Sequence, residues 1–172
     1  SARLLCKRGT AAKKGYRTSR METAKLKNAT AELLDRLYKN VKMGSDSIIS
    51  LLPKVESEDS KFKSDLTLQL NGYESLAHRI NGLRREAGEE ALEDTMINKM
   101  TAKVSTAMGT LMDSSVHHIA DMMVKGSTMN VTETIKLIRE FENTTASEGS
   151  LALARDIVKF EEENIERMKA YL

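Results

Sequence analysis

A single proline, Pro53, interrupts a chain of 172 residues in which Ala, Leu, Met, Lys and Glu are plentiful. Proline ends helices because it has no amide hydrogen and its ring clashes with the preceding turn, whereas the other five residue types favour the helical conformation. From Met21 onward the apolar residues recur at helical spacing, three or four positions apart. The sequence therefore predicts an all-α protein with long helices.

The first half of the chain predicts two helices, one on each side of Pro53. The first begins near Met21, and its apolar face continues to Leu52. The second begins after Ser57, a residue type that caps helix N-termini, and extends to about residue 86. Each helix has about 30 residues, which corresponds to a rod of about 45 Å at a rise of ~1.5 Å per residue.

The second half of the chain predicts a third helix over residues 95–125, which Gly126 ends. Two further N-capping signatures follow, each with a capping side chain three residues before a glutamate. They predict that the fourth rod is broken into a short helix at 131–143 and a long helix at 146–171.

Four rods with one apolar face each predict an antiparallel four-helix bundle over residues 22–172. The connection after the second helix, residues 86–94, spans at most about 30 Å when it is extended. Because that is short for a connection along the whole bundle, we expect up-down-up-down topology. A crossover connection would require the second helix to end early or the third helix to start late.

Residues 1–21 differ from this bundle in charge. The first 20 residues carry seven basic and no acidic side chains, whereas the rest of the chain carries 20 basic and 25 acidic ones. This segment fits a basic arm for nucleic acid or anionic lipid, a targeting-like segment, or a sequence foreign to the fold. We favour the last interpretation, with Met21 as the natural start, because the polar positions follow no helical period. A nucleic-acid partner is then expected only if residues 1–20 are native.

Composition also limits the kind of site and compartment. Cys6 is the only cysteine, which excludes an intramolecular disulfide framework and a multi-cysteine metal site. No stretch approaches the roughly 18 apolar residues of a membrane-spanning helix. The sequence has no Gly-rich phosphate loop and no zinc-ligand spacing. We expect a cytoplasmic protein without a membrane partner that forms a homo-oligomer, a dimer.

Polar side chains interrupt the apolar faces of three predicted helices. Gln69 in the second helix, His118 in the third, and Glu161 or Glu162 in the last fall where the helical period assigns the interior. Burying such groups is costly unless they are paired or bind a metal ion. A metal centre and a metal-free hydrogen-bonded core both fit this pattern, and the residues alone leave that choice open.

The stretches Gly72-Tyr73-Glu74 and Phe160-Glu161-Glu162, together with residues 112–121, resemble the helices of ferritin-like proteins, and in particular of small, poorly characterised bacterial members. The resemblance implies a bundle that binds iron or another transition metal near its middle, with iron oxidation or peroxide handling as its chemistry if it is an enzyme. The metal ligands that it implies are Glu74, His118, Glu161 and Glu162.

The chain departs from the Glu-x-x-His motif of ferritin-like di-iron proteins. Ala77 stands three residues after Glu74, and Asn164 stands three residues after Glu161. A complete di-iron site is therefore not present, and we expect a centre that is altered or lost. Two hypotheses follow: a ferritin-like bundle that binds a metal, or a non-enzymatic structural or oligomerisation module with a hydrogen-bonded polar core and no metal.

Overall fold

The computed structural model describes residues 6–56, 58–92 and 113–172, with side chains from residue 29 onward. These ranges contain helices and no strand, as the all-α prediction requires. The helices are α1 (Cys6–Leu51), the short 3-10 helix η1 (Leu52–Lys54), α2 (Ser60–Glu86), α4 (Val116–Phe141) and α5 (Glu148–Lys169).

The helix ends follow from local chemistry. As predicted, α1 ends just before Pro53, which lies in η1, but it begins at Cys6 and not near Met21. The side chain of Ser115 caps α4 by accepting a hydrogen bond from the amide of His118 at 3.2 Å. Ser147 caps α5 in the same way by accepting from the amide of Ser150 at 3.2 Å. The predicted final helix is confirmed as α5 to within two residues at each end.

The predicted break at Gly126 is wrong, because α4 continues through this residue to Phe141. The short helix expected at 131–143 is therefore the second half of α4, and the chain breaks only between α4 and α5. A glycine inside a helix costs only about 1 kcal/mol relative to alanine. Apolar side chains that are buried on both sides of Gly126, such as Met123 and Leu137, outweigh this cost. The expected helical segment 95–112 lies outside the described residues.

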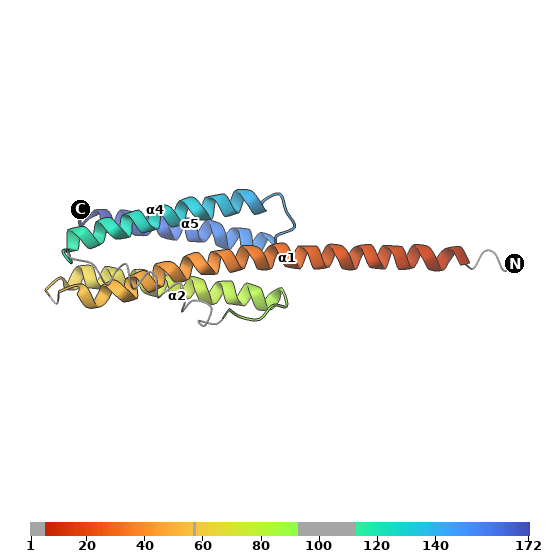
Figure 1. The fold of residues 1–172 in the computed structure, drawn as a ribbon, viewed down its shortest axis with the longest axis horizontal. Helices are drawn as coiled ribbons and strands as arrows, with labels where there is room; N and C mark the ends of the chain where they lie inside the picture. Colours follow the sequence, from red (N-terminus) through yellow and green to blue (C-terminus); the bar gives the residue numbers. More distant parts are fainter. Residues whose placement is uncertain (1–5, 57, 93–112) are drawn as a thin grey trace.

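The directions of the helices differ from the up-down-up-down topology that we expected. In Figure 1, α2 and α4 start at the end of the bundle at which α1 and α5 finish. The chain between Glu86 and Val116 therefore connects opposite ends, which is the crossover alternative. The described residues 113–115, which were predicted to be helical, precede α4 without helical structure, and 29 residues between Glu86 and Val116 are enough to reach the opposite end of the bundle.

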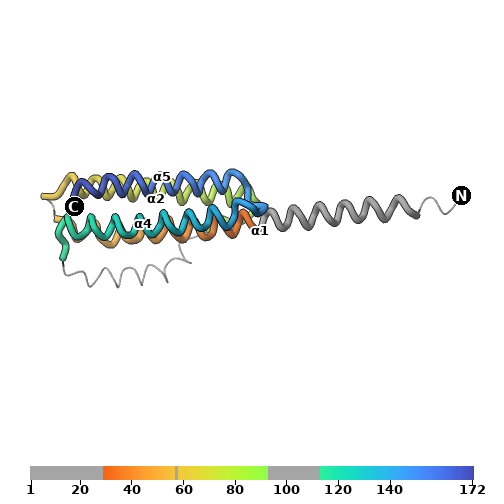
Figure 2. The backbone as a smooth tube through the Cα atoms, turned by 90° about the horizontal axis from the view of Figure 1, so that it is seen from above, coloured from red at the N-terminus to blue at the C-terminus, as the bar shows by residue number. Residues whose placement is uncertain are grey.

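The helices pack as two hairpins that share one core. The most extensive contacts are those between α4 and α5 and between α1 and α2, whereas α2 with α5 and α1 with α4 form smaller contacts. The view along the perpendicular direction in Figure 2 shows the same four rods side by side. Fully buried Leu, Ile and aromatic side chains fill the space between them, namely Leu33, Leu34, Leu37, Ile48, Leu51, Phe62, Leu66, Tyr73, Ile80, Ile119, Leu153 and Ile157.

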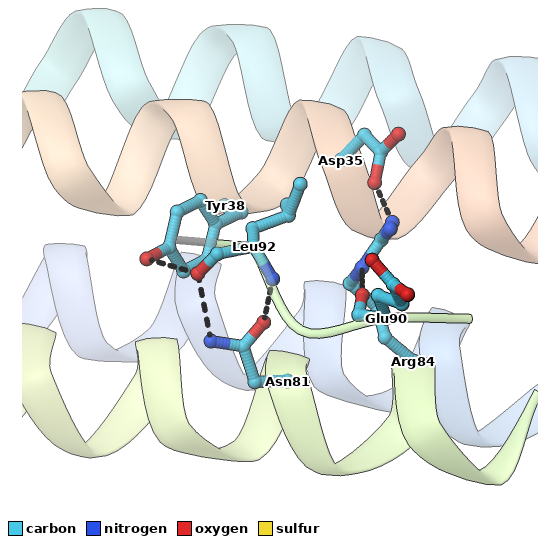
Figure 3. A network of polar contacts seen from close by, with 6 residues as sticks. All are labelled: Asp35, Tyr38, Asn81, Arg84, Glu90 and Leu92. Atoms are coloured by element: carbon cyan, nitrogen blue, oxygen red, sulfur yellow. Dashed lines mark hydrogen bonds and ion pairs between the residues drawn. The ribbon is translucent and has the colours of Figure 1, made fainter. Parts of the chain in front are cut away.

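The chain that leaves α2 turns back along this helix. Gly88 adopts a φ of 80°, a left-handed conformation that glycine reaches without a steric penalty. The amide of Leu92 then donates to Asn81 Oδ1 at 2.9 Å, and the carbonyl oxygen of Leu92 accepts from Tyr38 Oη at 3.1 Å (Figure 3). Residue 92 is thus fixed to both α1 and α2.

A second anchor lies one turn further along α2. Arg84 is buried, and its Nε donates to the carbonyl oxygen of Glu90 at 2.9 Å. The same guanidinium forms an ion pair with Asp35 of α1, as Figure 3 shows. One arginine therefore ties the α1–α2 hairpin to the segment that follows it.

Candidate functional site

Five polar residues meet inside the bundle, and we call them the polar core network. Gln69 and Tyr73 come from α2, Ser127 and Asn130 from α4, and Glu161 from α5. Gln69 and Glu161 have no solvent-exposed surface, and Tyr73 retains only 2% of its surface. Such groups are tolerated in a core only when their hydrogen bonds are made.

The carboxylate of Glu161 is the centre of the network. Tyr73 Oη lies 2.8 Å from Glu161 Oε1 and 2.9 Å from Oε2, and donates its proton to this carboxylate. Asn130 Nδ2 donates to Oε1 at 2.5 Å, and Ser127 also forms a hydrogen bond with Glu161. Gln69 Nε2 makes longer contacts of 3.4 Å with Tyr73 Oη and 3.5 Å with Ser127 Oγ. Neutral side chains therefore surround the only charged group of the network.

Burial controls the ionisation of the two central groups. Loss of solvent raises the pKa of Glu161, while the hydrogen bonds from Ser127, Tyr73 and Asn130 act in the opposite direction. Burial also raises the pKa of Tyr73, and the negative charge of Glu161 and the hydrogen bond to it raise this pKa further. Tyr73 therefore keeps its proton and remains a donor, so Glu161 is the group of this pair that titrates.

Two glycines allow the aromatic residues of the site to approach the neighbouring helices. A Cβ atom on Gly44 of α1 would lie 2.6 Å from Tyr73 Oη, and one on Gly72 of α2 would lie 2.7 Å from Phe160 Cζ. Phe160 in turn packs edge-on against Tyr73, with 5.0 Å between the ring centroids. The Tyr73 ring is thus confined by α1 and α5, and its hydroxyl is held at the carboxylate.

Beside the network lies a cavity of about 300 Å³ between α1 and α4. Tyr73, Ser127 and Asn130 belong to both the network and the cavity wall. Within the described residues, Asn130 Oδ1 and Gln69 Oε1 are buried without a hydrogen-bond partner. The network therefore provides hydrogen-bond donors to Glu161, whereas two of its own acceptor atoms receive no hydrogen bond from the described residues.

The structure separates the four residues that we predicted as metal ligands. Glu161 is buried in the network, whereas Glu74 and Glu162 are exposed on α2 and α5. His118 is half-buried in the first turn of α4. Consecutive helical residues point about 100° apart, so Glu74 cannot follow Tyr73 into the core. In the described part of the chain, no three His, Cys, Asp or Glu side chains are placed to hold a metal ion. Metal binding stays a prediction.

The helical period predicted Gln69 and either Glu161 or Glu162 as interior residues, and the structure selects Glu161; Ser127 and Asn130 were missed. The sequence pattern places Ser127 directly after the helix end predicted at Gly126, and it makes Asn130, three residues before Glu133, the cap of the next predicted helix. Their spacing contains a usable signal, because Ser127 lies four residues after Met123, and Thr134 lies seven residues after Ser127. Met123, Ser127 and Thr134 are all buried on α4. A continuous helix would have placed them on one inward face.

Comparison with known proteins does not constrain the function of this site. None of the helices in the described ranges has the length and apolar character needed to cross a bilayer. No protein-family model, no curated protein and no solved structure significantly matches the chain.

Proposed function

We propose that the protein is a non-enzymatic structural helical module in which the polar core network replaces a metal centre and fixes the alignment of α2, α4 and α5. The hydrogen bonding of Glu161 carries this proposal. Its two oxygens accept hydrogen bonds from the neutral side chains of Tyr73, Asn130 and Ser127. A carboxylate that is satisfied in this way needs no cation to remain buried.

The network favours one alignment of the helices because its residues must lie at the same level along the bundle axis. A shift of α5 by one helical turn, about 5.4 Å, would carry Glu161 away from Tyr73 and Asn130. The carboxylate would then lie among apolar side chains without donors, and Tyr73 would lose its acceptor. Because unpaired buried charges cost several kcal/mol, the wrong alignment is strongly disfavoured.

The antiparallel, ferritin-like arrangement belongs to the same proposal. Three contacts between α2 and α5 support it, because the residue numbers rise along one helix as they fall along the other. They join Asp65 to Tyr171, Tyr73 to Glu161, and Arg79 to Asp156. The resemblance of the sequence to bacterial ferritin-like proteins then corresponds to a bundle that retains the architecture and has lost the metal ligands.

Self-association is the second part of the proposed function. The proposed species is a homo-dimer in the cytoplasm. Its self-association is supported by five large apolar side chains that are exposed on the described surface, namely Met43, Ile49, Leu68, Met129 and Leu172. Light scattering of the purified chain measures its mass directly. A dimer mass supports the proposal, and a monomer at all accessible concentrations rejects this part of it.

Binding of iron or another transition metal through Glu74, His118, Glu161 and Glu162 is the competing hypothesis, and metal analysis separates the two. The protein is incubated with ferrous iron, desalted and analysed as wild type, Glu161→Gln and the exposed-neighbour control Glu162→Gln. A structural network predicts substoichiometric metal in all three proteins and a cooperatively folded Glu161→Gln variant. Near-stoichiometric metal in the wild type that is lost in Glu161→Gln would reject the structural role.

A further inference from the structure

The outer face of α4 carries a projecting apolar side chain beside a hollow. Met129 retains 68% of its surface, more than any other large apolar residue in the described part of the chain. It lies on the α4 side of the cavity of about 300 Å³, and Met43, which is 40% exposed, lies on the α1 side. Apolar surface of this kind, with a projection and an adjacent hollow, is suited to contact with another protein surface.

Charges of opposite sign flank Met129 on the same face of α4. Lys125 lies four residues before Met129, and Glu133 lies four residues after it. Residues four apart on a helix are neighbours on its surface, and the side chains of Lys125 and Glu133 are 72% and 55% exposed. Each of the two pairs with a neighbouring residue of α4 at 2.6 Å. Exposed pairs within one helix contribute little to stability, so both charges remain able to contact a partner.

This arrangement of charges is complementary to itself under twofold symmetry. If α4 of one copy packs antiparallel to α4 of a second copy about an axis at Met129, each residue faces the one equally far on the other side of Met129. Lys125 of each copy then faces Glu133 of the other, which gives two opposite-charge pairs. A parallel arrangement would place Lys125 at the level of Lys125 and Glu133 at the level of Glu133. The charges therefore favour the antiparallel arrangement.

The other residues of this face allow two such helices to approach closely. Gly126 lies three residues before Met129, and Thr132 lies three residues after it, so the antiparallel arrangement pairs two small residues. A Cβ atom on Gly126 would meet nothing within 4 Å, so the surface is open there, beside the cavity that Gly126 also lines. Met122 and Lys136 are each seven residues from Met129, so the alkyl chain of the lysine can cover the methionine of the other copy.

We propose that the α1–α4 face, marked by Met43, Gly126 and Met129, binds a second copy of this chain. In the complex α4 packs antiparallel to α4 of the other copy, and Met129 of each copy enters the cavity of the other beside Gly126. This inference rests on the self-association proposed above and assigns its surface and symmetry. Because both copies use the same residues, the contact closes on itself and association ends at the dimer.

A charge at Met129 tests the surface. The mass of the full chain is followed by light scattering through a dilution series for wild type, Met129→Glu and Leu68→Glu. Leu68 is the matched control, because it is 54% exposed on α2 and lies outside the cavity lining. We expect a wild-type dimer, a dissociation constant at least about tenfold higher in Met129→Glu, and no change in Leu68→Glu. Wild-type dimerisation of Met129→Glu, with its fold verified by circular dichroism, would overturn this surface but not the dimer, whereas a monomeric wild type would reject both proposals.

An exchange of charges tests the antiparallel symmetry. At low salt, Lys125→Glu and Glu133→Lys should each raise the dissociation constant at least about tenfold, because each places like charges opposite one another twice. The double variant restores opposite charges and should recover most of the wild-type affinity. Residues 125 and 133 are about 12 Å apart along one helix, so this recovery requires a contact between copies. Lys159→Glu, on the exposed surface of α5, should leave dimerisation unchanged. A double variant that is weaker than both single variants would overturn the arrangement.

Discussion

The phenol of Tyr73 in α2 lies against the backbone of Gly44 in α1. A Cβ atom at residue 44 would be 2.6 Å from Tyr73 Oη and 2.7 Å from Cε1, distances that real side chains do not adopt. Tyr73 cannot move aside freely, because Phe160 packs on its ring and Glu161 holds its hydroxyl. Gly44 is therefore required by packing, although a helix interior otherwise disfavours glycine.

Replacement of this glycine is predicted to destabilise the fold. Gly44→Ala should lower the free energy of unfolding by about 1–3 kcal/mol, because the overpacking is larger than the gain in helix propensity. Urea denaturation measures the change. Gly82→Ala provides the control: its Cβ meets open space, so we expect a gain of up to about 1 kcal/mol. If both variants were stabilised equally, Gly44 would not be a packing glycine.

The raised pKa of Glu161 predicts a specific pH dependence of stability. Above the ordinary carboxyl pKa of 4.5 and below the raised value, the folded state keeps a proton on Glu161 that the unfolded state has lost. The contribution of this group to stability therefore falls as the pH rises through that window. Glu161→Gln lacks the titrating group, so its stability relative to the wild type should increase from pH 4 to pH 8. A difference that is independent of pH would contradict a raised pKa.

A second pH dependence is expected at alkaline pH, where the phenol of Tyr171 loses its proton. Its hydroxyl donates to Asp65 at 2.5 Å, and its pKa is raised to about 12 by burial, followed by the hydrogen bond and charge of Asp65. We expect Asp65→Asn to lower this pKa toward the ordinary value of 10, as measured by tyrosinate absorbance. Because the folded pKa is raised, its contribution to stability is lost as the pH rises from 10 to 12.

The exposed Asp156 offers a control for the tyrosine titration. Asp156 pairs with Arg79 and makes no contact with Tyr171 among the described interactions, so Asp156→Asn should leave the absorbance titration unchanged. If Asp65→Asn also left the titration unchanged, the contact between Asp65 and Tyr171 would have no effect on the phenol.

The anchor at Leu92 is predicted to protect one amide from solvent. The Leu92 amide donates to Asn81 Oδ1 at 2.9 Å, and Asn81→Ala removes this acceptor. Hydrogen exchange of the Leu92 amide should then accelerate at least about tenfold, which corresponds to a loss of roughly 1.4 kcal/mol of local stability. The amide of Glu89 donates to the carbonyl oxygen of Arg84 at 2.9 Å and should stay protected. Unchanged exchange at Leu92 would exclude the anchor.

The sequence was sufficient for the helices whose ends depend on strong local signals. Pro53 marks the end of α1, and the capping signature from Thr145 to Glu148 places α5 to within two residues, although the residue that caps it is Ser147. It was insufficient at Gly126, where a residue that often ends helices lies inside α4. There the buried contacts of Met123 and Leu137 decide the outcome, and these depend on partners from other helices.

The site shows the same division between local and tertiary information. Helical periodicity placed Gln69 in the interior and narrowed the buried carboxylate to Glu161 or Glu162, because these properties depend on spacing alone. It did not identify which groups satisfy Glu161, since Asn130 and Tyr73 come from other helices. The donors that surround the Glu161 carboxylate could therefore be identified only from the relative positions of α2, α4 and α5.

The division of the bundle into an α1–α2 hairpin and an α4–α5 hairpin has a consequence for assembly. Tyr73 belongs to one hairpin and Glu161 to the other, so their hydrogen bond crosses the seam between the halves. We expect two separate polypeptides, residues 22–92 and 113–172, to reconstitute the bundle. The carboxylate of Glu161 would be hydrated in the free fragment and would accept the hydrogen bond from Tyr73 only after association. Since burial raises its pKa, reconstitution at a pH between the ordinary carboxyl pKa of 4.5 and the raised value should take up a proton, and association of the two fragments should weaken as the pH rises through this window.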